Sequence, residues 1–256
     1  MGTSEQARES VEAGVTNVAG GKAGAASAAG PALGQSVDGG TKEEREYRSR
    51  VLVWIGIVVA LGFPSLPVAK WVNEFAGIGN LVGYELIWWA VVGFLLAYVA
   101  VVERRPLSSL GFRALTKVDL VVAIAAALVM VAGLATIYYL VFPWLGISEN
   151  SQIGVLLATP LWWRIISVIR AAVSEEVLFR GYAIERLEGL TGSRGVAATV
   201  SCVVFAAAHV GPWGWGHLLI AGFGGVMLTA LYLWRRNLWV NIIAHAVVDG
   251  VAVLSG

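Results

Sequence analysis

Charged residues and cysteine are both scarce in this chain. Only 14% of its 256 residues are charged, against about 25% in a typical soluble domain, and 57% are hydrophobic. The mean hydropathy of +0.74 is that of an integral membrane protein. The formal net charge of +1 leaves no basic face for a nucleic acid. Cys202 is the single cysteine, so an intrachain disulfide and a cysteine-ligated metal cluster are both excluded.

Large apolar side chains are rare at the N-terminus. Residues 1–44 consist mainly of Gly, Ala, Ser, Thr and small charged residues, which cannot bury enough surface to fold. We therefore expect a disordered cytoplasmic tail over residues 1–44 and a transmembrane domain over residues 45–256. No apolar stretch follows Met1 closely enough to form the core of a signal peptide, so none is expected.

Apolar runs dominate the rest of the chain. A helix needs about 20 residues to cross a hydrocarbon core of about 30 Å. In lipid, each crossing segment must satisfy its own backbone hydrogen bonds, which selects helices. The sequence therefore predicts an all-α fold, a polytopic membrane bundle of about seven transmembrane helices at residues 50–69, 80–102, 118–144, 157–188, 195–210, 217–234 and 238–255.

Lys and Arg are concentrated in alternate loops. Cytoplasmic loops of membrane proteins carry an excess of these residues. The segments "GISENSQ" and "HVGPWGWGH" carry neither of them, which is typical of external loops. The alternation predicts a cytoplasmic N-terminus and an external C-terminus. The basic residues used are Arg45, Arg48, Arg50, Arg104, Arg105, Arg113, Lys117, Arg186, Arg194, Arg235 and Arg236.

The fourth run contains five charged residues: Arg164, Arg170, Glu175, Glu176 and Arg180. Each would cost roughly 2.5 to 3.5 kcal/mol at the centre of a membrane helix, so we expect them to be paired, hydrated or functional. Glu176 and Arg180 have the i, i+4 spacing of an ion pair. Glu175 points about 100° away around the helix and lacks that partner. We predict one structural ion pair and one carboxylate available for acid–base chemistry.

Two more polar stripes follow on later helices, Phe205 with His209 in "FAAAH", and Asn241 with His245 and Asp249 in "NIIAHAVVD". A carboxylate and histidines that share a cavity can activate water. Glu175 could take a proton from a water that His209 also holds, and donors from His245 and Asp249 could meet the developing oxyanion. This arrangement predicts peptide hydrolysis without a covalent enzyme intermediate.

Three motifs resemble those of the CAAX protease and bacteriocin-processing family. "EEVLFR" matches EExxxR, "FAAAH" matches FxxxH and "HAVVD" matches HxxxN/D, in that order and each on a predicted membrane helix. The similarity covers roughly residues 80–255, including the loop "ERRPLSSLGFR", and its motif core is at about 157–255. The resemblance implies a metal-independent intramembrane glutamic endopeptidase that uses no metal and no other cofactor.

The resemblance also implies a role for each motif residue. Glu175 would be the base that activates water, with His209 as its partner on that water. His245 and Asp249 would stabilise the oxyanion. Glu176 and Arg180 would support the site.

Asp249 departs from the pattern of the prenyl-processing members, which carry Asn at this position. An ionised Asp would repel an oxyanion. Asp249 is therefore expected either to be protonated or to orient His245. Asn241, one turn before His245, could then supply an amide donor.

Three other functions fit the same residues. One is a non-catalytic peptide-binding scaffold or bacteriocin-immunity protein, and another is a proton-coupled transporter. A third is a metal-dependent intramembrane hydrolase that uses Glu175, His209 and His245 as ligands. The expected partners are the lipid bilayer and a peptide or membrane-protein substrate, with or without a lipid group, and no nucleic acid. The resemblance to bacterial members suggests a bacterial plasma membrane.

Overall fold

The fold is all-α, as the sequence predicts. The computed structural model describes residues 41–67, 80–147, 154 and 156–254, and every regular element in these ranges is a helix. Residues 1–40 of the predicted tail lie outside the described residues. The α-helices are α1 (Lys42–Gly62), α3 (Asn80–Ala97), α4 (Lys117–Thr136), α5 (Phe142–Leu145), α7 (Leu161–Glu175), α8 (Glu185–Thr191), α9 (Arg194–Ala208), α10 (Val210–Trp213), α11 (His217–Arg235) and α12 (Leu238–Leu254). Shorter 3-10 or π segments are η1 (Phe63–Ser65), η2 (Tyr98–Val102), η3 (Leu107–Leu110), η4 (Ile137–Val141) and η5 (Glu176–Ile184).

Each of the seven predicted spans coincides with a helical stretch. Among the described residues, five stretches are long and apolar enough to cross a membrane: Lys42–Ser65, Leu81–Val102, Lys117–Leu145, Arg194–Trp213 and His217–Arg235. The other two predicted spans are α12, which has 17 residues, and the charged stretch from α7 to α8. The chain is thus an integral membrane protein, and the two spans that depart from plain apolar helices carry most of the candidate site.

Local sequence sets the helix ends near the site. α4 begins with a reciprocal capping box between Thr116 and Asp119, and the Ser193 side chain caps the first turn of α9. Gly192 ends α8 with a φ of 66°, which glycine adopts readily because it has no Cβ. The resulting short turn lets α9 pack back along α8 and η5. This places the C-terminal end of α9 beside the junction of α7 and η5.

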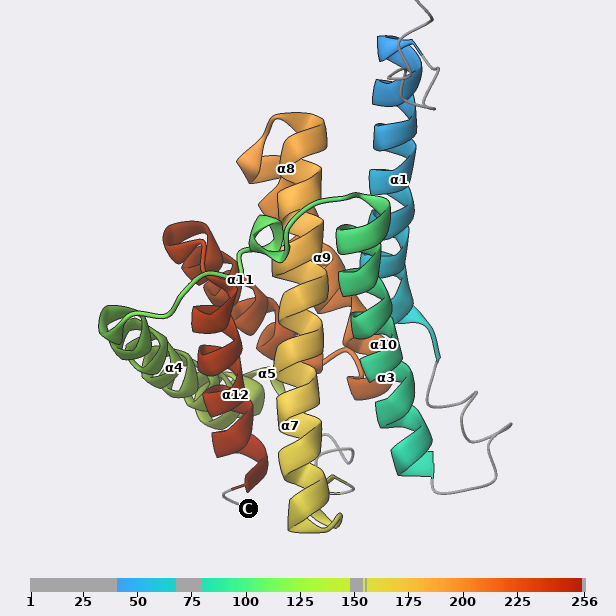
Figure 1. Cartoon of the computed structure of the whole chain (residues 1–256). Coiled ribbons are helices and arrows are strands. Elements are labelled where there is room, and N and C mark those ends of the chain that lie inside the picture. The colour runs from blue at the N-terminus through green and yellow to red at the C-terminus, as the bar shows by residue number, and fades with distance from the viewer. Residues whose placement is uncertain (1–40, 68–79, 148–153, 155, 255–256) are drawn as a thin grey trace, which may run out of the picture. The chain divides into compact units, whose positions relative to one another are not determined.

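The continuous helix from Leu161 to Thr191 is the element around which the others pack. Its middle part, η5, is a π-helix whose nine residues are all buried. α12 contacts α7 on one side and α4 on the other, and Figure 1 shows it lying between them. α1 and α9 contact η5. The helix carrying Glu175 and Glu176 is therefore flanked by helices from both halves of the chain.

The loop between η2 and α4 covers one end of this central helix. Leu110 is fully buried, and its carbonyl lies 3.0 Å from where a Cβ on Gly181 would sit, so a larger residue there would crowd the loop backbone. The Tyr182 hydroxyl donates a hydrogen bond to Glu103. Glu103 also pairs with Arg186 at 2.8 Å, and both side chains are only 2% exposed. Apolar packing and a buried ion pair together close this end of the bundle.

Candidate active site

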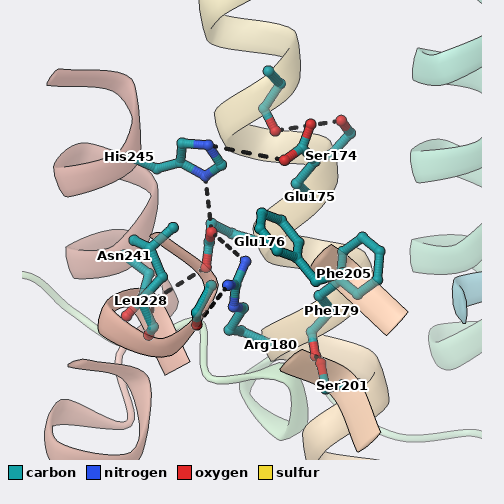
Figure 2. Close-up of polar contacts among 12 residues, drawn as sticks. Ser174, Glu175, Glu176, Phe179, Arg180, Ser201, Phe205, Leu228, Asn241 and His245 are labelled. Atoms are coloured by element: carbon teal, nitrogen blue, oxygen red, sulfur yellow. Dashed lines mark hydrogen bonds and ion pairs between the residues drawn. The ribbon is translucent and has the colours of Figure 1, made fainter. Parts of the chain in front are cut away.

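The motif residues converge where α7 passes into η5. Glu175 is the last residue of α7 and Glu176 the first of η5. His209 caps the C-terminal end of α9, while His245 and Asp249 lie on α12. Figure 2 shows the carboxylates of Glu175 and Glu176 both pointing toward the ring of His245. Three segments that are separate in sequence thus contribute to one polar cluster inside the bundle.

Glu176 and Arg180 form the ion pair that their spacing predicts. Nη1 of Arg180 lies 2.9 Å from Oε1 of Glu176, and both side chains are 0% exposed. Nη2 of Arg180 also donates to the carbonyl of Gly225 at 3.1 Å. A charge at this depth is tolerated only when it is paired and hydrogen-bonded, and both conditions are met for Glu176. This pair therefore belongs to the framework beneath the site.

Two groups on α12 complete the shell around Glu176. Nδ1 of His245 donates to Oε1 of Glu176 at 2.9 Å. Nδ2 of Asn241 donates to Oε2 of Glu176 at 3.0 Å and to the carbonyl of Leu228 at 2.7 Å. These bonds, drawn in Figure 2, connect α12 to η5 through the Glu176 carboxylate and α12 to α11 through the Asn241 amide. Because Nδ1 of His245 is engaged, its Nε2 is the nitrogen that faces Glu175.

Glu175 faces the Nε2 atoms of His209 and His245. Its Oε2 lies 3.8 Å from Nε2 of His209 and 3.9 Å from Nε2 of His245. These distances are too long for direct hydrogen bonds and are compatible with a water molecule between the groups. The Glu175 side chain is 15% exposed, in contrast to the fully buried Glu176. The two adjacent carboxylates therefore have different surroundings, as the sequence predicts.

The phenylalanine of the FxxxH motif holds its histidine and the arginine in place. The carbonyl of Phe205 lies 2.7 Å from Nδ1 of His209, so that nitrogen must carry the proton and Nε2 points to Glu175. The Phe205 ring packs 4.3 Å beneath the guanidinium of Arg180 and stacks edge-on with Phe179 at 5.1 Å. One aromatic side chain thus contacts both Arg180 and His209.

Asp249 and Asn241 occupy opposite ends of the polar stripe on α12. Oδ2 of Asp249 lies 3.5 Å from Nε2 of His245, and its side chain is 32% exposed. Asn241 is fully buried, and its amide group already donates to Glu176 and Leu228. The geometry therefore differs from the expectation that Asn241 offers an amide donor to an oxyanion, because its donors are committed to the framework.

Three further contacts were not predicted from the sequence. The ring of His217, at the start of α11, stacks on His209 with a centroid distance of 5.8 Å and on Trp213 at 5.1 Å. Arg170 pairs with the buried Glu85 of α3 at 3.3 Å. The chain has three histidines, and all of them lie at or beside the cluster. The scarcity of histidine in the sequence was the only feature that could have pointed to a place for His217 beside the cluster.

The described residues contain no group of three His, Cys, Asp or Glu side chains arranged to hold a metal ion. His245 lies 2.9 Å from Glu176, 3.5 Å from Asp249 and 3.9 Å from Glu175, and Glu175 lies 3.8 Å from His209. The approach of two imidazoles to one oxygen of Glu175 is the chemical feature that the structure offers at this point.

The membrane-embedded helical bundle thus brings Glu175 close to two histidines. Residues 157–251 match the family model described as type II CAAX prenyl endopeptidase Rce1-like. The match confirms the resemblance drawn from the three motifs, and it includes all seven residues singled out for the site. Residues 80–156, where the resemblance was also drawn, lie outside the matched segment. No curated protein and no solved structure matches the chain.

Proposed function

We propose that this protein is an intramembrane endopeptidase in which Glu175 activates a water molecule for attack on a peptide bond, without a metal. The observation that carries the proposal is the approach of two histidine Nε2 atoms to the same oxygen of Glu175, at 3.8 Å and 3.9 Å. A water between these three atoms would be within hydrogen-bonding reach of each. The family match supports a peptidase that acts on a CAAX-type substrate in general.

The first step is the activation of this water. Glu175 removes one proton, and Nε2 of His209 accepts the other O–H of the water, because Nδ1 carries the ring proton and donates it to the carbonyl of Phe205. The hydroxide formed attacks the carbonyl carbon of the substrate and gives a tetrahedral oxyanion. Partial removal of the site from bulk water strengthens each of these electrostatic interactions.

The second step needs donors for the oxyanion and a proton for the leaving amine. His245, held through Nδ1 by Glu176, can direct an Nε2–H at the oxyanion in its doubly protonated form. Asp249, 3.5 Å away, either donates as a protonated acid or orients that imidazole. Glu175 then returns its proton to the amine as the carbon–nitrogen bond breaks, which restores the carboxylate.

The buried framework explains why a second carboxylate adjoins the base. Glu176 anchors His245 and Asn241 and is neutralised by Arg180, all within the fully buried part of the bundle. Rigid support of this kind keeps reacting groups at productive distances. We propose a peptide or membrane-protein substrate, with or without a lipid group, and a bacterial plasma membrane with the N-terminus in the cytoplasm.

The test is a comparison of peptide termini in membranes that contain the native chain or Glu175→Gln, each with and without a strong chelator. Products that appear only with the native chain and persist in chelator support the proposal and identify the substrate. Glu46→Gln, an exposed carboxylate on α1, is the matched control and should retain every product. Products lost in chelator favour a metal-dependent hydrolase. Identical termini at equal expression favour a binding or immunity role.

A further inference from the structure

The exposure of the candidate site increases in one direction along the bundle. On α12, Asn241 is fully buried, the His245 side chain is 7% exposed and that of Asp249 is 32% exposed. On the central helix, Arg180 and Glu176 are 0% exposed, whereas Glu175 is 15% exposed. The site is therefore more exposed at one end of the bundle. This end holds the C-terminal end of α12 and the part of the central helix that precedes Glu175.

The opposite end of the site is closed. All nine residues of η5 lie beyond Glu175 and are buried. Below them, Glu103 pairs with Arg186 at 2.8 Å with almost no exposure, and the fully buried Leu110 packs against the same helix. A polypeptide that came from this side would have to break the Glu176–Arg180 pair before it reached Glu175, at a large energetic cost.

Side chains from α10 and α11 line the open end. The His217 ring lies nearly parallel to the His209 ring, at a centroid distance of 5.8 Å and an angle of 16°, and it also stacks with Trp213 at 5.1 Å and 20°. His217 also interacts electrostatically with Asp249. Both His217 and Trp213 are partly exposed. The rings of Trp213 and His217 therefore lie beside His209 and Asp249, which border the open end.

We propose that the substrate reaches Glu175 from the end of the bundle that holds α10 and the first turn of α11, past a wall formed by Trp213 and His217. These two residues contact the substrate and limit what can enter. The inference rests on the proposed function for the identity of the substrate. The position of the entrance, however, can be measured without any hydrolysis.

The test uses the full chain with Cys202→Ser and a reporter thiol, Glu175→Cys, in detergent micelles. The measurement is the rate at which Cys at position 175 reacts with methanethiosulfonate ethylammonium, a small charged thiol reagent. His217→Trp, which places a larger ring at the proposed entrance, should slow this reaction at least tenfold. Gly189→Trp, at the closed end where a Cβ meets nothing within 4 Å, is the matched control and should change the rate less than twofold.

Size-exclusion elution and thermal unfolding would reveal whether His217→Trp misfolds. A second variant keeps the proposal testable in that case. Trp213→Ala opens the wall and should speed the reaction at least twofold. The proposal is overturned if Gly189→Trp slows labelling and His217→Trp does not, or if the thiol reacts only after denaturation. Because the assay needs no substrate, it can succeed even if Glu175 proves not to catalyse hydrolysis, and the two proposals fail separately.

Discussion

Replacement of Arg180 by alanine would leave the Glu176 carboxylate in the interior with only His245 and Asn241 as partners. Both members of the pair are 0% exposed, so water cannot take the place of the guanidinium. Loss of one partner of a fully buried ion pair costs about 3–5 kcal/mol. For a chain of this size, such a loss corresponds to a fall in the unfolding temperature of about 6–20 °C.

The assay is thermal unfolding of the purified full chain in one detergent, with Arg194→Ala as control. Arg194 pairs with Glu188 at 3.2 Å, but its side chain is 60% exposed, so its loss should cost no more than about 1 kcal/mol. The double variant Glu176→Gln, Arg180→Met removes both charges and should recover most of the stability lost by Arg180→Ala. If Arg180→Ala unfolds at the same temperature as Arg194→Ala, the reasoning about a buried, paired charge is wrong.

Three further predictions concern the site and the packing of the bundle. Glu175→Gln and His209→Ala should each reduce hydrolysis at least about 100-fold while accumulating normally in the membrane, because the proposed mechanism uses both residues on the attacking water and both side chains are partly exposed. Failure to accumulate, measured by immunoblot, would indicate a structural role instead. Asp249→Asn should keep activity within about tenfold of native, since an amide can either donate to an oxyanion or accept from His245, and an inactive Asn variant would show that the carboxylate itself is needed. Gly56→Ala should destabilise the protein by about 1–3 kcal/mol, because its Cβ would lie 1.8 Å from the Tyr182 hydroxyl, whereas Gly62→Ala has nothing within 4 Å and serves as the thermal-unfolding control.

Features governed by near neighbours in the chain could be predicted from the sequence. The apolar runs have the length of membrane helices, and the structure has a helical stretch at each. The i, i+4 spacing of Glu176 and Arg180 predicted their pair, because helix geometry alone brings such residues together. The sequence also predicted different surroundings for the two adjacent carboxylates, because neighbours on a helix point in different directions.

Contacts between distant segments could not be predicted in the same way. The bond from His245 to Glu176 joins residues 69 positions apart, and the pair of Arg170 with Glu85 joins α7 to α3. Such contacts depend on how helices cross and rotate against one another, which the periodicity of a single segment does not contain. The stacking of His217 on His209 likewise depends on the path of the chain between α9 and α11.

The sequence by itself determined that this is a membrane-embedded helical protein with three motif-bearing helices, because hydropathy and spacing are local properties of the chain. Only the tertiary structure decided that Asn241 serves the framework, that one oxygen of Glu175 lies 3.8 Å and 3.9 Å from two imidazole nitrogens, and that the cluster is more exposed toward one end. The physical reason is that each of these features requires the side chains of several helices to occupy one small volume, and that arrangement is set by packing of the whole bundle.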